Sequence, residues 1–195
     1  MKKMFCCLSV FLLLAITESF AIPREGTMTD FRDECTYKIV NTGSKTIMTE
    51  NLRYNSSTSF NWTEALDISS KYQKKENTYV ENVEVKGICP EGWHIPSVEE
   101  FFDALAPLSI KKKVHFFDEG EEWDEEIFVF NSKYSSLMGF KSGEEYWTKD
   151  QIHCCDGPDE FAHTFVVKGK EITNRSNLYG SIKTAKLQIR CMKDR

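Results

Sequence analysis

The clearest pattern of apolar and polar positions in the chain lies between residues 97 and 107. One helical face is formed by apolar residues at positions i, i+3, i+4 and i+7, namely Val98, Phe101, Phe102 and Leu105. Ser97 stands before this face and Glu100 follows Ser97 by three residues, which is the spacing of a capping box. Pro107 disfavours helical backbone at the residue before it. The sequence therefore predicts a helix over about residues 98–106.

A second helical face precedes this one. Its members are Trp62, Ala65, Leu66 and Ser69. Asn61 stands at its start, and Asn is a preferred N-cap because its side-chain oxygen accepts a backbone N–H of the first turn. The pattern predicts a helix over about residues 61–71.

Short β-rich segments contain most of the other apolar positions. Residues 36–40 and 45–48 flank the turn 41–44, which predicts a hairpin. Further strands are expected at residues 83–85, 128–130, 146–148, 161–167 and 185–191. The last of these alternates, with Ala185, Leu187, Ile189 and Cys191 on one face. Residues 22–30 are expected to form a flexible lead-in, and the elements together predict an α+β fold.

The first 21 residues have the features of a secretory signal. Lys2 and Lys3 supply a positive start, and the apolar run over residues 10–16 is too short to span a bilayer. Ser19-Phe20-Ala21 fits a small-x-small cleavage site, so Ile22 is the expected mature N-terminus. The sequence thus predicts export through the Sec pathway to the periplasm, the cell surface or the medium, and no later segment is expected to cross a membrane.

Composition narrows the class of protein and its partners. The chain has 195 residues, 41% hydrophobic and 28% charged, which is typical of one globular domain. Its net charge of -5 disfavours nucleic acid and anionic membranes as partners, because both attract basic surfaces.

Five cysteines follow the signal sequence: Cys35, Cys89, Cys154, Cys155 and Cys191. Export exposes them to oxidation, so disulfides are expected, and the odd number leaves at least one thiol free or bound to another molecule. His153 precedes two adjacent cysteines, but zinc ligands need spacing to converge, so disulfide chemistry is favoured and no metal site is expected. Either Cys35 pairs with Cys154 or Cys155, or the last two bridge each other; the sequence leaves these alternatives open.

Several motifs along the chain resemble those of the Fibrobacter succinogenes major paralogous domain family. Residues 89–100, C-P-E-G-W-H-I-P-S-V-E-E, are similar to its strongest motif, "C-P-x-G-W-H-L-P-S-x-x-E". Weaker matches are Asp30-x-Arg32-Asp33-x-x-x-Tyr37, Met48-Thr49-Glu50-Asn51-Leu52-x-Tyr54, residues 60–66, Tyr146-Trp147-Thr148 and Arg190-Cys191-Met192-Lys193-Asp194. The resemblance covers about residues 28–194, nearly all of the chain after the signal.

This resemblance implies a single C-type-lectin-like domain. Two helices are then expected to pack on a mixed or antiparallel sheet whose terminal strands are adjacent. It also implies a disulfide between Cys89 and Cys191, because the lectin-like arrangement brings those two places together. The family's members are exported or surface-displayed modules of largely unknown function.

Candidate ligand-binding residues lie in two acidic segments. Residues 118–126 surround Trp123 and are interpreted as a solvated surface loop, with a calcium-binding or ligand-binding loop as the alternative. Asp156 and Asp159, with Glu160, could supply oxygen ligands to calcium. The Glu-Pro-Asn and Trp-Asn-Asp motifs of sugar-binding C-type lectins are absent, so calcium is a minor alternative to having no cofactor.

The sequence favours an exported, non-catalytic binding, adhesion or surface-display module with no catalytic residues. Its variable loops between about residues 109 and 160 would recognise a ligand, and a polysaccharide or an envelope protein is the partner considered. One alternative is an enzyme of the formylglycine-generating type, a branch with the same fold, but its cysteine pair has a short spacer that Cys154-Cys155 lacks. The other alternative is a structural component of the cell surface or matrix.

Overall fold

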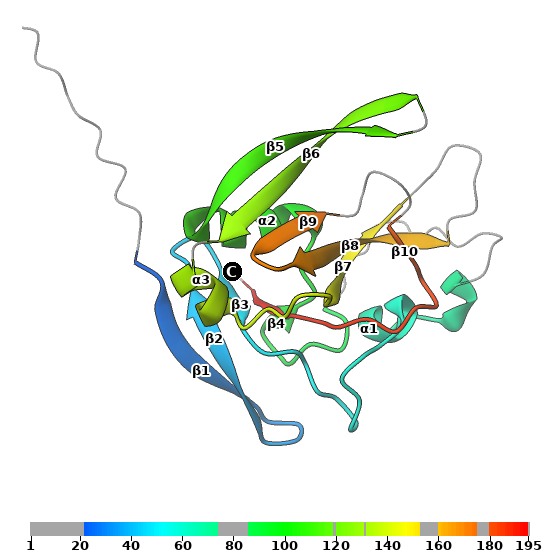
Figure 1. Ribbon diagram of the computed structural model, residues 1–195. Coiled ribbons are helices and arrows are strands. Elements are labelled where there is room, and N and C mark those ends of the chain that lie inside the picture. Colours follow the sequence, from blue (N-terminus) through cyan, green and yellow to red (C-terminus); the bar gives the residue numbers. More distant parts are fainter. Residues whose placement is uncertain are drawn as a thin grey trace, which may run out of the picture.

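The computed structural model describes residues 22–73, 86–118, 120–130, 132–152, 160–174 and 180–194, and these contain two antiparallel sheets and three α-helices (Figure 1). The first sheet has the strand order β1-β2-β3-β11-β4. Its strands are β1 (Arg24–Asp30), β2 (Cys35–Asn41), β3 (Thr46–Met48), β11 (Met192–Lys193) and β4 (Trp93–His94). The predicted hairpin is confirmed as β2 and β3. Strands β1 and β11 belong to one sheet, but β2 and β3 separate them, so the expected adjacency of terminal strands is not observed.

Strand β1 corrects the expected flexible lead-in at residues 22–30. It pairs along its whole length with β2, from Arg24 opposite Asn41 to Asp30 opposite Cys35. Most of its side chains are exposed, and the strand lies at the edge of the sheet. An edge strand of this kind needs no alternation of apolar residues, which is the pattern that sequence reading looks for.

The second sheet has the order β10-β8-β9-β6-β5, and β7 also pairs with β8. Its strands are β5 (Ser109–Asp118), β6 (Glu121–Phe130), β7 (Glu145–Gln151), β8 (Phe161–Lys168), β9 (Glu171–Asn174) and β10 (Ser181–Ile182). The strands predicted at residues 128–130, 146–148 and 161–167 are confirmed as parts of β6, β7 and β8. Residues 83–85 lie outside the described residues.

The acidic segment 118–126 is part of a hairpin of two ten-residue strands, not a surface loop. The hairpin extends away from the rest of the molecule in Figure 1. Ion pairs cross it between Lys111 and Glu126 at 2.6 Å and between Lys113 and Asp124 at 2.5 Å. Opposite charges on facing strands stabilise such a ladder, although each exposed pair contributes little.

Helices α1 and α2 each begin directly after the N-cap residue that the sequence predicts. Helix α2 (Val98–Leu105) confirms the predicted helix: Ser97 accepts the N–H of Glu100, whose carboxylate accepts the N–H of Ser97. Helix α1 (Trp62–Leu66) has the same box between Asn61 and Glu64. It ends earlier than predicted, because Asp67 adopts a left-handed conformation (φ 54°), and a 3₁₀ turn (Ser70–Gln73) follows. Helix α3 (Ser132–Met138) was not predicted.

The segment 185–191 crosses between the two sheets instead of forming the regular strand that was expected (Figure 1). Leu187 bridges Phe60, and Gln188 bridges Tyr146 of β7. The carbonyl of Ile189 accepts the N–H of Leu52 at 2.9 Å, and that of Cys191 accepts the N–H of Met48 at 3.0 Å. Its backbone hydrogen bonds thus go to several different segments, and with none of them does it form a continuous β-ladder.

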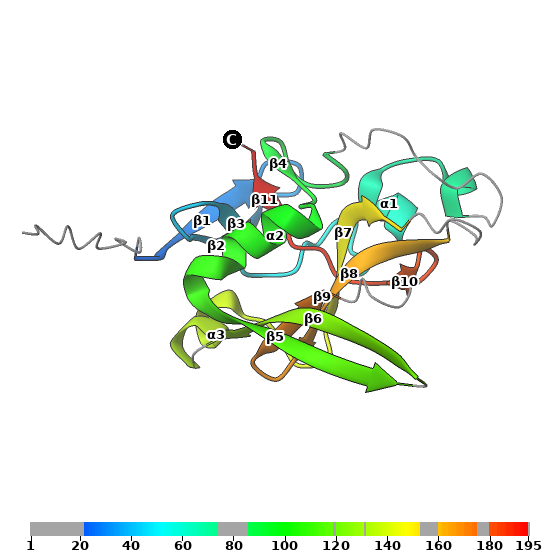
Figure 2. The ribbon, with the colours of Figure 1, turned by 90° about the horizontal axis from the view of Figure 1, so that it is seen from above.

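Two buried clusters fill the space between these elements. One surrounds Trp62 and Trp147, which are both fully buried. The other packs α2 against both sheets, between which α2 lies in Figure 2. Phe101 stacks on Phe165 of β8 at a ring-centroid distance of 4.2 Å, and Val40 of β2 belongs to the same cluster. No helix of the described residues is long and apolar enough to cross a membrane.

The structure contains the expected disulfide between Cys89 and Cys191, which are 102 residues apart. It joins the turn before α2 to the strand β11. Nearby, the carboxylate of Glu100 faces Nε2 of His94 at 3.1 Å, and Asp194 faces Nδ1 of the same ring at 2.6 Å. These contacts hold the C-terminal strand against the start of α2.

Removing this disulfide by the double substitution Cys89→Ala and Cys191→Ala should lower the free energy of unfolding by about 2–5 kcal/mol, because the bridge closes a long loop in the unfolded chain. Urea unfolding measures the change. Cys35→Ala is the control, since Cys35 forms no disulfide with another cysteine of the described residues. Non-reducing peptide mapping that joins Cys89 to any cysteine other than Cys191 would contradict the pairing.

Glu100 should make stability depend on pH. Burial raises its pKa, but the backbone N–H of Ser97 and the nearby cations outweigh burial and lower the pKa to about 2. The ionised Glu100 carboxylate therefore stabilises the fold fully above pH 4.5, its ordinary pKa. This stabilisation is lost as the pH falls through about 2. Glu100→Gln should cost about 1 kcal/mol at pH 7, because solvent screens a partly exposed carboxylate.

Urea unfolding of Glu100→Gln and wild type between pH 2 and pH 7 measures this difference, which should shrink toward the acid end. The matched control is Glu99→Gln, since Glu99 is exposed in the same helical turn. A Glu100→Gln deficit that stays constant down to pH 2 would show that the lowered pKa is wrong.

Candidate functional site

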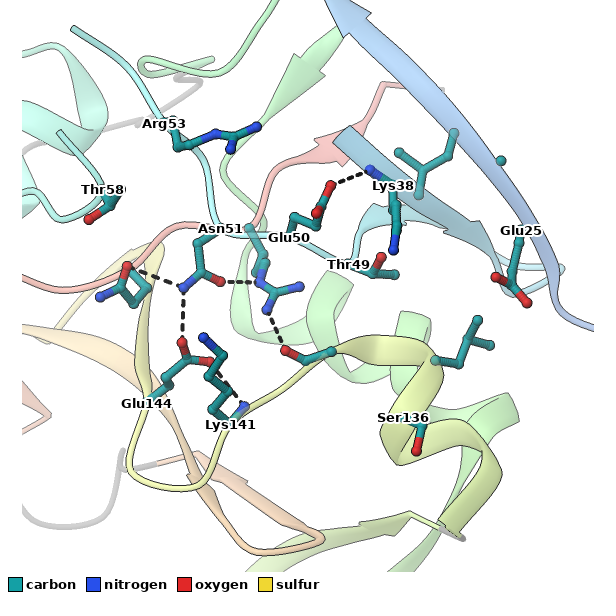
Figure 3. Close-up of a pocket in the computed structure, with 16 residues that line it drawn as sticks. Glu25, Lys38, Thr49, Glu50, Asn51, Arg53, Thr58, Ser136, Lys141 and Glu144 are labelled. Atoms are coloured by element: carbon teal, nitrogen blue, oxygen red, sulfur yellow. Dashed lines mark hydrogen bonds between the residues drawn. The ribbon is translucent and has the colours of Figure 1, made fainter. Parts of the chain in front are cut away.

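A cavity of about 640 Å³ opens beside α3, between the β1–β2 hairpin and the segment that precedes β7 (Figure 3). We call it the Arg190 pocket. Its lining residues are Glu25, Gly26, Lys38, Ile39, Thr49, Glu50, Asn51, Arg53, Thr58, Ser136, Leu137, Gly139, Lys141, Glu144, Gln188 and Arg190. They come from four distant parts of the chain, and most are charged or polar.

Arg190 forms the buried wall of this pocket, with only 2% of the residue exposed. Its Nε donates to Oδ1 of Asn51 at 2.6 Å. Nη1 donates to the carbonyl of Met138 at 3.1 Å, and Nη2 to the carbonyl of Gly139 at 3.2 Å and to the Tyr146 hydroxyl at 3.3 Å. Burial lowers the pKa of the guanidinium, and Tyr146 and Glu144 oppose that shift.

Asn51 and Tyr146 connect Arg190 to the carboxylate of Glu144, which closes a ring of hydrogen bonds. Asn51 Nδ2 donates to Oε1 of Glu144 at 3.1 Å, and the Tyr146 hydroxyl and the N–H of Lys141 donate to Oε2. Burial raises the pKa of Glu144, but these hydrogen bonds outweigh burial and hold the pKa below its ordinary value. Burial also raises the pKa of Tyr146, so the ring contains a neutral phenol, a carboxylate and a guanidinium.

The backbone explains why these side chains meet. The N–H of Met48 bonds to the carbonyl of Cys191 and that of Leu52 to the carbonyl of Ile189, which sets Asn51 opposite Arg190. Gly139 has a positive φ of 59°, and a Cβ there would lie 2.7 Å from the carbonyl oxygen of Thr49. Only glycine fits this close approach, which turns the carbonyl at the end of α3 toward the guanidinium.

The rim of the pocket carries separate charges. The Glu50 carboxylate accepts the backbone N–H of Lys38 at 2.8 Å, which leaves the Lys38 ammonium out of that bond. The Arg53 guanidinium lies over the ring of Tyr37, 5.3 Å from its centroid. Figure 3 shows Lys38 and Lys141 on opposite sides of the pocket. Among the described residues, neither ammonium has a hydrogen-bond acceptor or an ion-pair partner.

A second cavity of about 380 Å³ shares three lining residues with the Arg190 pocket, namely Glu25, Ser136 and Leu137. It continues along α3 past Tyr134 toward Ile22 and Pro23. The two cavities are therefore neighbours: the first contains the polar wall at Arg190, and the second is lined in part by Ile22 and Pro23.

The ligand-binding residues expected from the sequence lie largely outside the described structure, so that expectation stays a prediction. Trp123 belongs to β6, but its side chain lies outside the described part. Asp156 and Asp159 lie outside the described residues, as do Cys154 and Cys155, so the calcium alternative stays a prediction. Cys35 is a free, half-buried thiol at the start of β2. Within the described ranges, no cluster of three or more His, Cys, Asp or Glu residues is placed to hold a metal ion.

In the sequence, Asn51 and Arg190 stood out only as parts of family motifs. Their hydrogen bond to each other in the wall of the pocket was not predicted. The available signal was an arginine between Ile189 and Cys191, in a run expected to be buried. A charged residue at such a position needs hydrogen-bond acceptors, which marks a polar site inside the fold.

Tyr146→Phe should lower the free energy of unfolding by about 1–3 kcal/mol at pH 7, because it removes one donor from Glu144 and one acceptor from Arg190 in a buried place. Chemical unfolding measures the loss. Tyr72→Phe is the control, since no hydrogen bond of the Tyr72 hydroxyl occurs within the described structure. Equal stability of the two variants would show that the ring contributes nothing.

Comparison of the chain with protein-family models, with curated proteins and with solved structures gave no match. The resemblance to the Fibrobacter succinogenes major paralogous domain family therefore stays a prediction. Function is inferred below from the Arg190 pocket.

Proposed function

We propose that this protein is an exported, non-catalytic binding module that holds a polar ligand in the Arg190 pocket. The observation that carries the proposal is a cavity of about 640 Å³ lined by Asn51, Glu144 and Arg190, three members of a closed ring of partly buried hydrogen bonds. Its volume falls in the range of small-molecule sites, roughly 300–1,000 Å³. The secretory features of residues 1–21 support the exported part of the proposal.

The ring favours binding because it fixes the wall before a ligand arrives. Each of Asn51, Glu144, Tyr146 and Arg190 is held by at least two hydrogen bonds to other residues. A ligand then loses less free energy in ordering side chains, which is the usual advantage of a preorganised site. Polar groups fixed in one geometry also favour one orientation of the ligand over others.

The same contacts support binding without turnover. The Glu144 carboxylate is bound by a phenol, a side-chain amide and a backbone N–H, and its pKa is lowered, which makes it a weak general base. Burial raises the pKa of the Tyr146 phenol, so this hydroxyl stays protonated and is a poor nucleophile. The charged wall is thus better suited to hold a ligand than to transfer protons.

A polysaccharide chain suits the extended shape of the site. The Arg190 pocket and the cavity of about 380 Å³ are neighbours beside α3, and a ligand that occupies both would follow a groove along this helix. Several linked sugar units can lie in such a groove, with hydroxyl groups bound at its polar end. This supports adhesion to a surface carbohydrate as the biological use of the module.

The test is a glycan and polysaccharide binding screen of residues 22–195, with and without calcium. It includes Ser136→Trp, which fills the pocket from α3, and Ser132→Trp, one turn earlier on the same helix and not among the lining residues. Each substitution removes one hydrogen bond of an exposed side chain, so the pair is matched. Ser136→Trp should weaken binding roughly tenfold or more, a change of about 1.4 kcal/mol or more.

Mass spectrometry of the recovered ligand should show an unchanged mass, since no turnover is expected. A screen without any ligand, or equal binding by the two tryptophan variants, would refute the pocket as the binding site. A ligand returned with a changed mass would refute the non-catalytic part of the proposal.

A further inference from the structure

We infer that the Arg190 pocket takes a carboxylate-bearing sugar, that is, a uronic-acid unit of an acidic polysaccharide. This inference rests on the proposed function and specifies its ligand. It follows from the charges of the pocket, taken one at a time.

The first observation is a buried cation without a contacting anion. Arg190 is only 2% exposed, but its four hydrogen bonds go to an amide, two carbonyls and a phenol, all neutral. Within the described residues, no carboxylate touches the guanidinium; Glu144 reaches it only through Asn51 and Tyr146. Buried charges are normally paired, because an unpaired one loses its hydration without compensation. Glu144 and Glu50 act on the charge of Arg190 without touching the guanidinium. An anion in the adjoining pocket would add a further counter-charge close to it.

The second observation is the pair of lysines on the rim. The ammonium groups of Lys38 and Lys141 have no acceptor in the described structure, and they lie on opposite sides of the pocket (Figure 3). Cations on two sides of a cavity attract an anionic group placed between them. The pocket therefore attracts an anion even though the protein as a whole has a net charge of -5.

The third observation limits how much negative charge the site tolerates. Glu25, Glu50 and Glu144 also line the pocket. They would repel a phosphate group, which carries about −1.5 to −2 charges at neutral pH, more strongly than a carboxylate with a single charge. Their oxygens can instead accept hydrogen bonds from hydroxyl groups, and Thr49 and Gln188 add further polar groups to the wall. A carboxylate with several neighbouring hydroxyls is the chemistry of a uronic acid.

The experiment is calorimetric titration of residues 22–195 with trigalacturonate, with the neutral trisaccharide maltotriose, and with inorganic phosphate. Trigalacturonate should bind, and its affinity should fall as sodium chloride is added, because salt screens the charges. Lys38→Gln and Lys141→Gln should each weaken it roughly 5- to 30-fold, as expected for one or two kcal/mol. Lys112→Gln on β5 is the matched control: it removes the same charge from an exposed residue that is not among the lining residues, and it should bind like wild type.

The other outcomes separate this inference from the proposed function. Equal or tighter binding of maltotriose would overturn the preference for a carboxylate and leave a carbohydrate-binding module standing. Phosphate that binds as tightly as trigalacturonate would show a general anion site and overturn the sugar. Binding that Lys38→Gln and Lys141→Gln do not weaken would place the acidic sugar elsewhere. Failure of both sugars to bind would overturn the inference, while the wider screen with the tryptophan variants would decide the proposed function separately.

Discussion

Burial of the Arg190 guanidinium constrains this structure more than any other single interaction around the pocket. A guanidinium removed from water loses several kcal/mol of hydration unless its N–H groups find acceptors. Those acceptors are supplied by Asn51, by the end of α3 and by Tyr146 of β7, at sequence distances of 139 to 44 residues. Each of these acceptors must keep its position, because otherwise an N–H of the buried guanidinium loses its hydrogen bond. The hydrogen bonds therefore fix the relative positions of segments that share no sheet ladder, and the pocket lies where they meet.

The two sheets depend on the same region of the chain. Residues 187–191 form backbone hydrogen bonds with Phe60, Glu145, Trp147, Leu52 and Met48, and the disulfide at Cys191 ties them to the turn before α2. Helix α2 then packs on both sheets through Phe101 and its neighbours. The apolar core and the polar wall of the site thus share one crossing segment. A change that shifts this segment would disturb the packing of the core and the wall of the pocket together.

Local signals in the sequence were sufficient for some elements and insufficient for others. The caps at Ser97 and Asn61 lie within three residues of their partners, so both helix starts could be predicted. Strand β1 and the acidic hairpin were missed because their exposed, charged faces hide the alternation of a half-buried strand. The binding candidates Trp123, Asp156 and Asp159 were chosen from local composition. The Arg190 pocket could not be predicted in this way, because its wall depends on contacts between residues 51, 144 and 190, and no local pattern encodes them.

The position of Arg190, just before β11 and far along the chain from its partners, also has a consequence for biosynthesis. The chain is synthesised from its N-terminus, so Asn51, Glu144 and Tyr146 emerge well before the residue that joins them. Until then the amide and the carboxylate have no guanidinium beside them, and Cys89 has no partner at Cys191. The earlier segments alone cannot form the site. The wall of the pocket is therefore complete only after this late segment has emerged.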